Sequence, residues 1–229
     1  MDAKVPSRYT LTLFGIAMAI TLAGIVGVAF QVGGEAGVKA IADIQEMVVV
    51  WLAAIVILRS SWMLGADSPV GRPWFWIGVG AAMYAIGDTI WTIIEVGMGL
   101  EVNYPGIPDI FYLAEYPFFA AGILMAGYAY RELVDIRRPN VLAALVGGIL
   151  SIGVFAALLW PTVISVSDIS RAEKIVSTLY PMGDIILMIT PAMFMLFVVA
   201  QLGGGRLAWP WWAVASGAGI IALADILYA

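Results

Sequence analysis

Acidic side chains occur inside apolar segments of this chain, where a charge is costly. The stretch "PWFWIGVGAAMYAIGD" (residues 73–88) carries no charge before its last residue, Asp88. The stretch "PWWAVASGAGIIALAD" (residues 210–225) has the same form and ends on Asp225. An ionised carboxyl group in the hydrocarbon core of a bilayer costs about 2.5–3.5 kcal/mol on insertion scales, so it usually faces the protein interior, a partner or water. These two aspartates therefore predict a site inside the protein.

The chemistry open to such carboxyl groups is proton binding, cation binding or hydrogen bonding. The sequence has no Cys and no His, which excludes disulfides, thiolate metal sites, histidine-ligated haem and histidine acid–base catalysis. The lysines are Lys4, Lys39 and Lys174, all near segment ends, which argues against a retinal Schiff base at a mid-membrane lysine. No nucleophile–base pair is recognisable, so we expect neither an enzyme nor a cofactor.

A wider set of acids and tyrosines shares the depth of the two aspartates. A helix rises 1.5 Å per residue, and counting from the segment ends places acids of four segments in the half of the bundle expected to face outward. The candidate ligand-binding residues are Asp88, Glu95, Asp109, Tyr112, Glu115, Tyr116, Asp184 and Asp225. They predict an acidic, aromatic-lined pocket open to the outside that binds a small ligand, a cation or a proton.

Structural roles compete with this interpretation. Asp109 follows a proline at an expected helix start, where an acid is favoured by the helix dipole. Asp43 and Glu46 lie where a segment meets the membrane interface, and solvation alone accounts for them. Asp88 and Asp225 lie too deep for a cap or an interface, so their structural alternative is an interhelical hydrogen bond.

The composition indicates which elements position these residues. The chain has 229 residues, of which 62% are hydrophobic and 12% charged, whereas soluble domains have about 45–50% apolar and about 25% charged residues. A membrane-spanning helix needs about 20 apolar residues. The segments that meet this length are about Tyr9–Phe30, Ile41–Met63, Pro73–Val96, Pro108–Tyr130, Val141–Val163, Ile175–Leu202 and Trp209–Ala229. We therefore predict an all-α fold, a single polytopic bundle of seven transmembrane helices.

Small residues and prolines predict details of the helix packing. Small residues gather in the third and seventh segments, where they favour close helix approach: Gly78, Gly80, Ala81, Ala82, Gly217, Ala218 and Gly219. Pro117 and Pro191 lie inside apolar segments and predict kinks.

The basic residues predict the orientation in the membrane. Eight lie on the side that holds the N-terminus, and three, Lys39, Arg171 and Lys174, lie on the other side. Cytoplasmic loops are enriched in Lys and Arg, so we expect the N-terminus inside. Because the last apolar run reaches Ala229 without a polar tail, we also expect an eighth helix to follow it.

The two opening stretches suggest an internal repeat. Without a gap they match at six of sixteen positions, including the first proline and the last aspartate. The third segment would then correspond to the seventh and the second to the sixth, with Asp43 near the position of Asp184. An offset of four helices gives parallel repeats, as in some transporters. We predict a parallel four-helix pseudo-repeat, with repeat one at about 9–130 and an incomplete repeat two at about 141–229.

Four stretches, "YAIGDTIW", "PDIFYLAEYPFFAAGIL", "LYPMGDIIL" and "LADILYA", occur in an order that looks familiar. Over about two-thirds of the chain it resembles the N-terminal membrane region of prokaryotic signalling proteins with cytoplasmic PAS, histidine-kinase, GGDEF or EAL domains. The resemblance implies a sensory role in the cytoplasmic (inner) membrane of a prokaryote and an eighth helix. It also implies a cytoplasmic kinase or cyclic-dinucleotide output domain as partner. This chain departs from that group because it contains no output domain.

Three functions remain open from the sequence. A membrane sensory domain would bind its stimulus in the acidic pocket and shift the helices around it. A proton- or cation-coupled transporter would use the parallel repeats and paired acids. An accessory subunit of a larger membrane complex would use the acids only for packing. For all three we expect the lipid bilayer as a partner, no nucleic acid, and a homo-oligomer.

Overall fold

A computed structural model describes residues 8–205 and 208–228 of the chain, and these residues form helices and loops without a strand. The helices are α1 (Arg8–Ala29), α2 (Gly34–Leu64), α3 (Gly71–Thr92), α4 (Ile107–Ala129), α5 (Arg137–Val154), α6 (Arg171–Gly183), α7 (Thr190–Gln201) and α8 (Trp209–Tyr228). Wider π-helical segments continue three of them: η1 (Ile93–Gly97) after α3, η2 (Phe155–Ile164) after α5, and η3 (Asp184–Ile189) between α6 and α7. The all-α prediction is confirmed.

Six helical spans in the described chain are long and apolar enough to cross a membrane: 11–29, 34–64, 71–97, 107–129, 137–164 and 171–201. The seventh, α8, has 20 residues, which extend about 30 Å at 1.5 Å per residue. The chain is therefore a multi-pass membrane protein by the length and composition of its helices.

Several helices begin earlier than the apolar runs that predict them. The helix α2 begins at Gly34, seven residues before the expected Ile41, after a tight turn in which Gly33 takes a φ of 80°. The span α6–η3–α7 begins at Arg171, where the Ser170 hydroxyl accepts a hydrogen bond from the Glu173 N–H at 3.1 Å. Both first turns carry polar residues and that of α6 has a side-chain cap, so the helices extend beyond the apolar runs.

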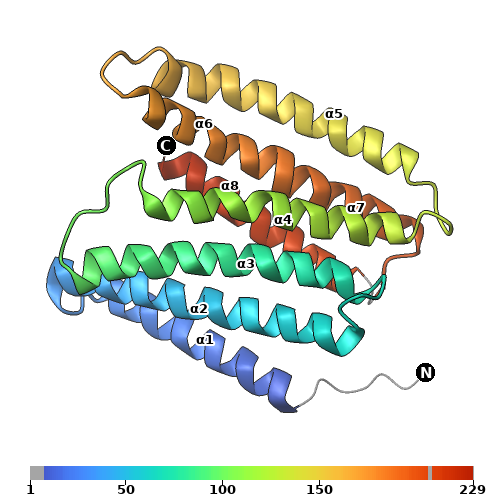
Figure 1. Cartoon of the computed structure of the whole chain (residues 1–229), viewed down its shortest axis with the longest axis horizontal. Coiled ribbons are helices and arrows are strands. Elements are labelled where there is room, and N and C mark those ends of the chain that lie inside the picture. The colour runs from blue at the N-terminus through green and yellow to red at the C-terminus, as the bar shows by residue number, and fades with distance from the viewer. Residues whose placement is uncertain (1–7, 206–207, 229) are drawn as a thin grey trace.

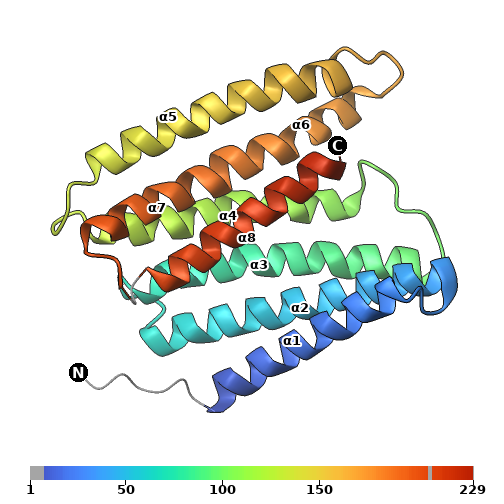
Figure 2. The ribbon, with the colours of Figure 1, turned by 180° about the vertical axis from the view of Figure 1, so that it is seen from behind.

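The helices are arranged in chain order over the first half of the bundle. Figure 1 shows α1, α2, α3 and α4 side by side, and α6–α7 next to α4 with α5 on the outside. The helix α8 crosses behind this row in Figure 1 and in front of it in Figure 2, and it packs against α7 and η3. This arrangement places η3 between α4, α5 and α8, so a side chain on η3 can meet several helices.

Close packing of α3 depends on glycine, as predicted, whereas that of α8 does not. A Cβ built on Gly78 would lie 2.7 Å from the Leu58 side chain of α2, and one on Gly80 would lie 3.2 Å from the Glu115 carbonyl oxygen of α4. A Cβ on Gly217 or on Gly219 would meet no described atom within 4 Å. The prediction of close packing is therefore wrong for these two glycines of α8, because no described helix approaches either of them closely.

The π-helical segment η3 lies between two prolines. Pro181 precedes it inside α6, and Pro191 follows it in the first turn of α7. Proline has no N–H and its ring clashes with the carbonyl four residues earlier, and a local π-turn is one way to relieve both defects. The Thr190 hydroxyl donates to the Ile185 carbonyl oxygen at 2.7 Å and so satisfies one acceptor of this widened turn. Pro117, by contrast, lies inside the continuous helix α4.

An apolar core joins α3, α4, α7 and α8 near the ends of these helices that lie away from Asp88 and Asp225. Ile77, Ile123 and Met195 are fully buried in it. Trp74 of α3 stacks on Trp211 of α8 with ring centroids 5.1 Å apart. Trp74 and Trp211 are also equivalent positions of the predicted repeat, which itself stays a prediction.

Candidate functional site

Tyrosine hydroxyls hold four carboxyl groups of the bundle, and each bond joins two different helical segments. Tyr84 donates to Glu46 at 3.0 Å, Tyr112 to Asp88 at 2.9 Å, Tyr116 to Asp184 at 2.9 Å, and Tyr180 to Asp109 at 2.6 Å. A phenol hydroxyl is a neutral donor, so these bonds satisfy a carboxyl group without neutralising its charge. The helices are thus tied to one another by acid–tyrosine pairs.

In two of these pairs the tyrosine packs against a Gly–Asp dipeptide in the same way. The ring of Tyr112 packs where a Cβ on Gly87 would stand, 2.6 Å from the ring carbon Cε1. The ring of Tyr116 packs in the same way on Gly183, 2.9 Å from that virtual Cβ. In each case the glycine makes room for the ring, and the aspartate that follows it accepts the hydroxyl. Since Tyr112 and Tyr116 are four residues apart, α4 presents both from one face.

Burial separates the predicted site residues into two groups. Asp88, Asp109 and Glu115 are 6%, 6% and 7% exposed, and Asp184 is fully buried. Asp225 is partly exposed, while Asp43 and Glu46 lie toward the surface of α2. The deep carboxyl groups are the ones that a membrane protein retains at a cost.

Asp184 is at the centre of the deep group. Its Oδ1 accepts the Tyr116 hydroxyl, and its carboxyl group lies within hydrogen-bonding range of the Asp225 carboxyl group of α8. Glu115 of α4 interacts electrostatically with Asp184, Asp88 and Asp225. Carboxyl groups of α3, η3 and α8 therefore lie within electrostatic range of Glu115 of α4. We call Asp88, Glu115, Asp184 and Asp225, with Tyr112 and Tyr116, the acid–tyrosine cluster.

Two carboxyl oxygens of this cluster are buried without a hydrogen-bond donor in the described chain. They are Oδ2 of Asp88 and Oδ2 of Asp184. A buried acceptor without a donor carries the full desolvation penalty, about 1–3 kcal/mol or more for a charged group. The cluster is therefore incompletely satisfied as it stands.

Glu95 lies outside the cluster and has a basic partner. The Lys39 ammonium group of α2 forms an ion pair with Glu95, and the Trp91 indole N–H donates to Glu95 at 2.7 Å. Lys39 lies near the end of its segment, as expected, and its side chain is 58% exposed. Its long side chain nevertheless reaches Glu95. Counting residues along the helix does not predict such a contact, because it ignores the length of the side chain.

Asp109 serves as a helix cap. Its Oδ2 accepts the backbone N–H of Gly106 at 2.6 Å, and its Oδ1 accepts the Tyr180 hydroxyl. Both carboxyl oxygens are thus occupied by donors that fix the first turn of α4 and tie it to α6. The geometry of Asp109 matches its structural alternative.

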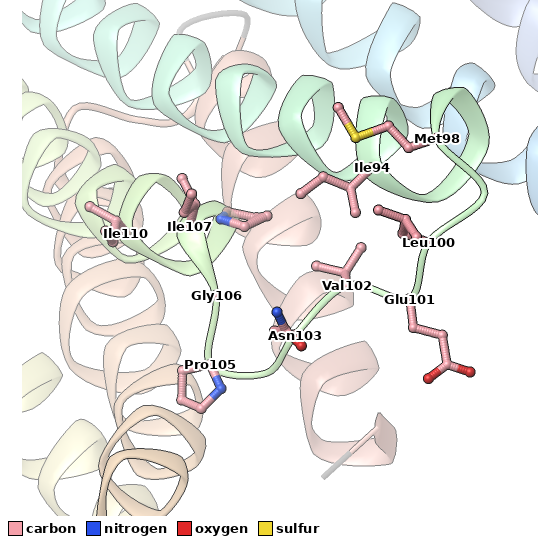
Figure 3. A pocket seen from close by; sticks show the side chains of 11 residues that line it. Ile94, Met98, Leu100, Glu101, Val102, Asn103, Pro105, Gly106, Ile107 and Ile110 are labelled. Carbon is pink, nitrogen blue, oxygen red and sulfur yellow. The ribbon is translucent and has the colours of Figure 1, made fainter.

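Two cavities of the described chain lie away from the acid–tyrosine cluster. One, of about 550 Å³, lies under the loop between η1 and α4, and Figure 3 shows its Ile94, Leu100 and Val102 side chains pointing toward one another while the Glu101 carboxylate points away. The other, of about 370 Å³, lies on α8 beside Trp209 and Trp212. The open acidic pocket stays a prediction, and at the deep carboxyl groups the structure shows packed tyrosine rings.

Within the described residues, no group of three or more acidic side chains is arranged to hold a metal ion. The cluster offers carboxyl oxygens in pairs with tyrosine hydroxyls, which suits proton sharing and hydrogen bonding.

Comparison of the chain with family models, with curated proteins and with solved structures gives no match. The resemblance to the membrane regions of signalling proteins therefore stays a prediction.

Sequence reasoning missed the partners of the acids more often than the acids themselves. Tyr180 and Glu46 were not among the candidate ligand-binding residues, although both form acid–tyrosine pairs. Gly87 and Gly183 were also overlooked. The repeated Gly–Asp dipeptide, in "AIGDTI" and "PMGDII", was the signal that could have found them.

Proposed function

We propose that this protein is a membrane-embedded sensory domain for signal transduction, and that the acid–tyrosine cluster receives its stimulus. The observation that carries the proposal is the position of Asp184. It is fully buried, it accepts Tyr116 from α4, and it faces Asp225 of α8. A change in charge or hydrogen bonding at this one residue acts on three helical elements together.

Such a change can act as a signal because the cluster is part of the packing of the bundle. A stimulus shifts a protein between two states only if it interacts differently with each of them. Ionisable residues inside a membrane are functional by default because their retention is costly. The Oδ2 atoms of Asp88 and Asp184 have no hydrogen-bond donor in the described chain. A stimulus that donates to these oxygens in one state and not in the other would interact differently with the two states.

The apolar core favours sensing over transport. The stacked rings of Trp74 and Trp211 lie 14 residues before Asp88 and Asp225 on the same helices, or about 21 Å at 1.5 Å per residue. Together with Ile77, Ile123 and Met195 they fill that end of the bundle with apolar side chains. A carrier needs polar groups along its route, and the described residues of this core do not continue the cluster with polar side chains.

The wider setting of the proposal follows the sequence predictions. We propose the cytoplasmic membrane of a prokaryote, with the N-terminus inside because Lys and Arg are enriched on that side. We also propose a homo-oligomer that passes its signal to a cytoplasmic kinase or cyclic-dinucleotide enzyme.

The test combines a conformational measurement with a flux measurement. The chain has no Cys, so cysteines can be introduced at Ile110 of α4 and Leu223 of α8, which are 66% and 57% exposed, and spin-labelled. In proteoliposomes we expect a change of external pH or cation to alter the distance between the labels without net ion uptake. Asp168→Asn, in the loop before α6, is the control that should leave the response intact.

Uptake of protons or cations that Asp88→Asn abolishes would contradict the sensory proposal and support a transporter. A bundle in which neither Asp88→Asn nor Asp225→Asn alters any response would support an accessory subunit.

A further inference from the structure

The facing carboxyl groups of Asp184 and Asp225 need a proton between them. Carboxylate oxygens are acceptors only, so two ionised groups cannot form a hydrogen bond with each other. Asp184 already uses Oδ1 for the Tyr116 hydroxyl at 2.9 Å, and its Oδ2 has no donor in the described chain. A single proton on either carboxyl group turns their mutual repulsion into a hydrogen bond.

We propose that Asp184 and Asp225 share one proton, and that this pair is a proton-binding site that fastens α8 to η3. The inference deepens the proposed function by naming the stimulus, and its signalling consequence rests on that function. The binding site itself rests on the full burial of Asp184, on its Oδ2 without a donor in the described chain, and on the packing of α8 against η3.

The groups around the pair are acids and tyrosines. From α4, Tyr116 and Glu115 interact with the pair. Glu46 of α2 interacts electrostatically with Asp225, and Asp88 of α3 interacts electrostatically with Glu115. From α6, the Tyr180 carbonyl oxygen accepts the same Tyr116 hydroxyl at 3.3 Å. The helix α7 has no titratable side chain, and those of α5, Arg137 and Arg138, are its first two residues.

These surroundings select the proton among possible ions. The interacting groups bring negative charge and no basic side chain, so a cation is needed for balance. The described residues contain no acidic group arranged to hold a metal ion. A proton fits because it needs only two facing oxygens.

A route for the proton follows from the exposure of the two residues. Asp184 is fully buried, whereas Asp225 is partly exposed. On deprotonation, the O–H bond of the Asp225 carboxyl group breaks, the proton passes to water, and two carboxylates remain facing each other. On protonation, water returns the proton to Asp225, which donates it to Asp184.

The π-helical segment η3, which carries Asp184, is suited to bend when the proton is lost. Asp184 is the first residue of the π-helical segment η3, which lies between Pro181 and Pro191. Helix distortions at prolines and π-turns are common points of bending. Loss of the shared proton would therefore separate α8 from η3 at a position where the helix is already widened.

Infrared spectroscopy tests the shared proton directly. We expect the folded full chain in lipid nanodiscs to show the carbonyl stretching band of a protonated carboxyl group, which disappears on raising the pH. Asp184→Asn and Asp225→Asn should each remove that band, whereas Asp168→Asn in the loop should keep it. A band that both Asn variants retain, or its absence from the wild-type chain at every pH, would overturn the proposal.

Spin labels at Ile110→Cys and Leu223→Cys test the fastening of α8. The wild-type distance should change over the same pH range as the infrared band. In Asp225→Asn the amide donates permanently to Asp184, so the distance should stay at its low-pH value. A distance change in Asp225→Asn equal to that of the wild type would refute the role of the pair, and circular dichroism will show that the variant is folded.

These results separate the site from the proposed function. If the band and distance change are present and ion flux also occurs, the proton site stands and the sensory proposal fails. If neither is present but another stimulus moves α8 without flux, the sensory proposal stands and the proton site fails.

Discussion

The substitution Tyr116→Phe isolates one bond of the acid–tyrosine cluster. It removes the hydroxyl that donates to Asp184 at 2.9 Å and leaves the ring on Gly183 in place. Hydrogen bonds to charged groups contribute about 1.5–3 kcal/mol in proteins generally. Interhelical hydrogen bonds in a membrane protein average about 0.6 kcal/mol and reach about 1.7 kcal/mol.

The burial of Asp184 determines how much the free energy of unfolding falls in Tyr116→Phe. Its side chain is fully buried and one of its oxygens already lacks a donor, so Tyr116→Phe leaves no tyrosine donor on this carboxyl group. We therefore expect the free energy of unfolding to fall by about 1.5 kcal/mol, near the upper end of the membrane values. The other bond of the hydroxyl, to the Tyr180 carbonyl at 3.3 Å, is longer and adds little.

The assay is unfolding by SDS titration in mixed micelles, with Tyr128→Phe as the matched control. Tyr128 is 39% exposed, and its hydroxyl accepts only a long bond from Asn140 at 3.4 Å, so its loss should change stability by less than about 0.5 kcal/mol. The double variant Tyr116→Phe/Asp184→Asn then gives the coupling energy between the two residues, expected at about 1 kcal/mol. A coupling energy of zero, or equal effects of the two Tyr→Phe substitutions, would refute the reasoning.

Three further predictions concern packing and surface charge. A Cβ on Gly87 would stand 2.6 Å from a tyrosine ring, so Gly87→Ala should lower the free energy of unfolding by about 1–3 kcal/mol. Gly217→Ala, where nothing lies within 4 Å, should raise it by up to about 1 kcal/mol through helix propensity; equal effects in SDS titration would contradict the packing. Trp211→Ala removes the ring stacked on Trp74 and should cost about 3–5 kcal/mol, and a wild-type unfolding midpoint would show that the stack is absent. Lys39→Ala removes an ion pair whose lysine is 58% exposed and whose glutamate is 16% exposed. It should lower the unfolding midpoint only slightly, whereas a larger, salt-dependent loss would show a buried pair.

The fold could be predicted because helices that cross a membrane are visible in the sequence as long runs of apolar residues. A spanning helix needs a long apolar run, and the runs in this sequence match the helical spans apart from their ends. The ends differ because first turns at the interface use polar residues, as at Ser170 and Glu173. Those residues interrupt the apolar run without interrupting the helix.

The acids of the cluster were predictable for the same reason, but their partners were not. A carboxyl group inside an apolar run is conspicuous, and Asp88 and Asp184 are buried as expected. Which hydroxyl reaches each acid depends on how the helices are rotated and how closely they approach. Sequence distance from Asp88 to Tyr112 carries no information on that rotation, whereas the glycine before each aspartate does.

Glu95 and Asp109 show where depth along a helix is a poor guide. Both were placed in the pocket because of their position in the segments. In the structure Glu95 pairs with Lys39, whose long side chain reaches it from the neighbouring helix. Asp109 caps α4 through the Gly106 N–H. A residue at the end of a segment has loop and surface partners that a count of residues cannot reveal.

The central claim is that carboxyl groups from separate helices meet inside the bundle at Asp184 and Asp225. An engineered metal bridge measures this directly, because the chain has no Cys and two facing thiolates bind soft ions such as Cd²⁺. In the double variant Asp184→Cys/Asp225→Cys, Cd²⁺ should raise the unfolding midpoint, since an ion that binds only the folded state stabilises it. Neither single variant should respond. Equal responses in the single and double variants, or none in the double variant, would contradict the meeting of these side chains.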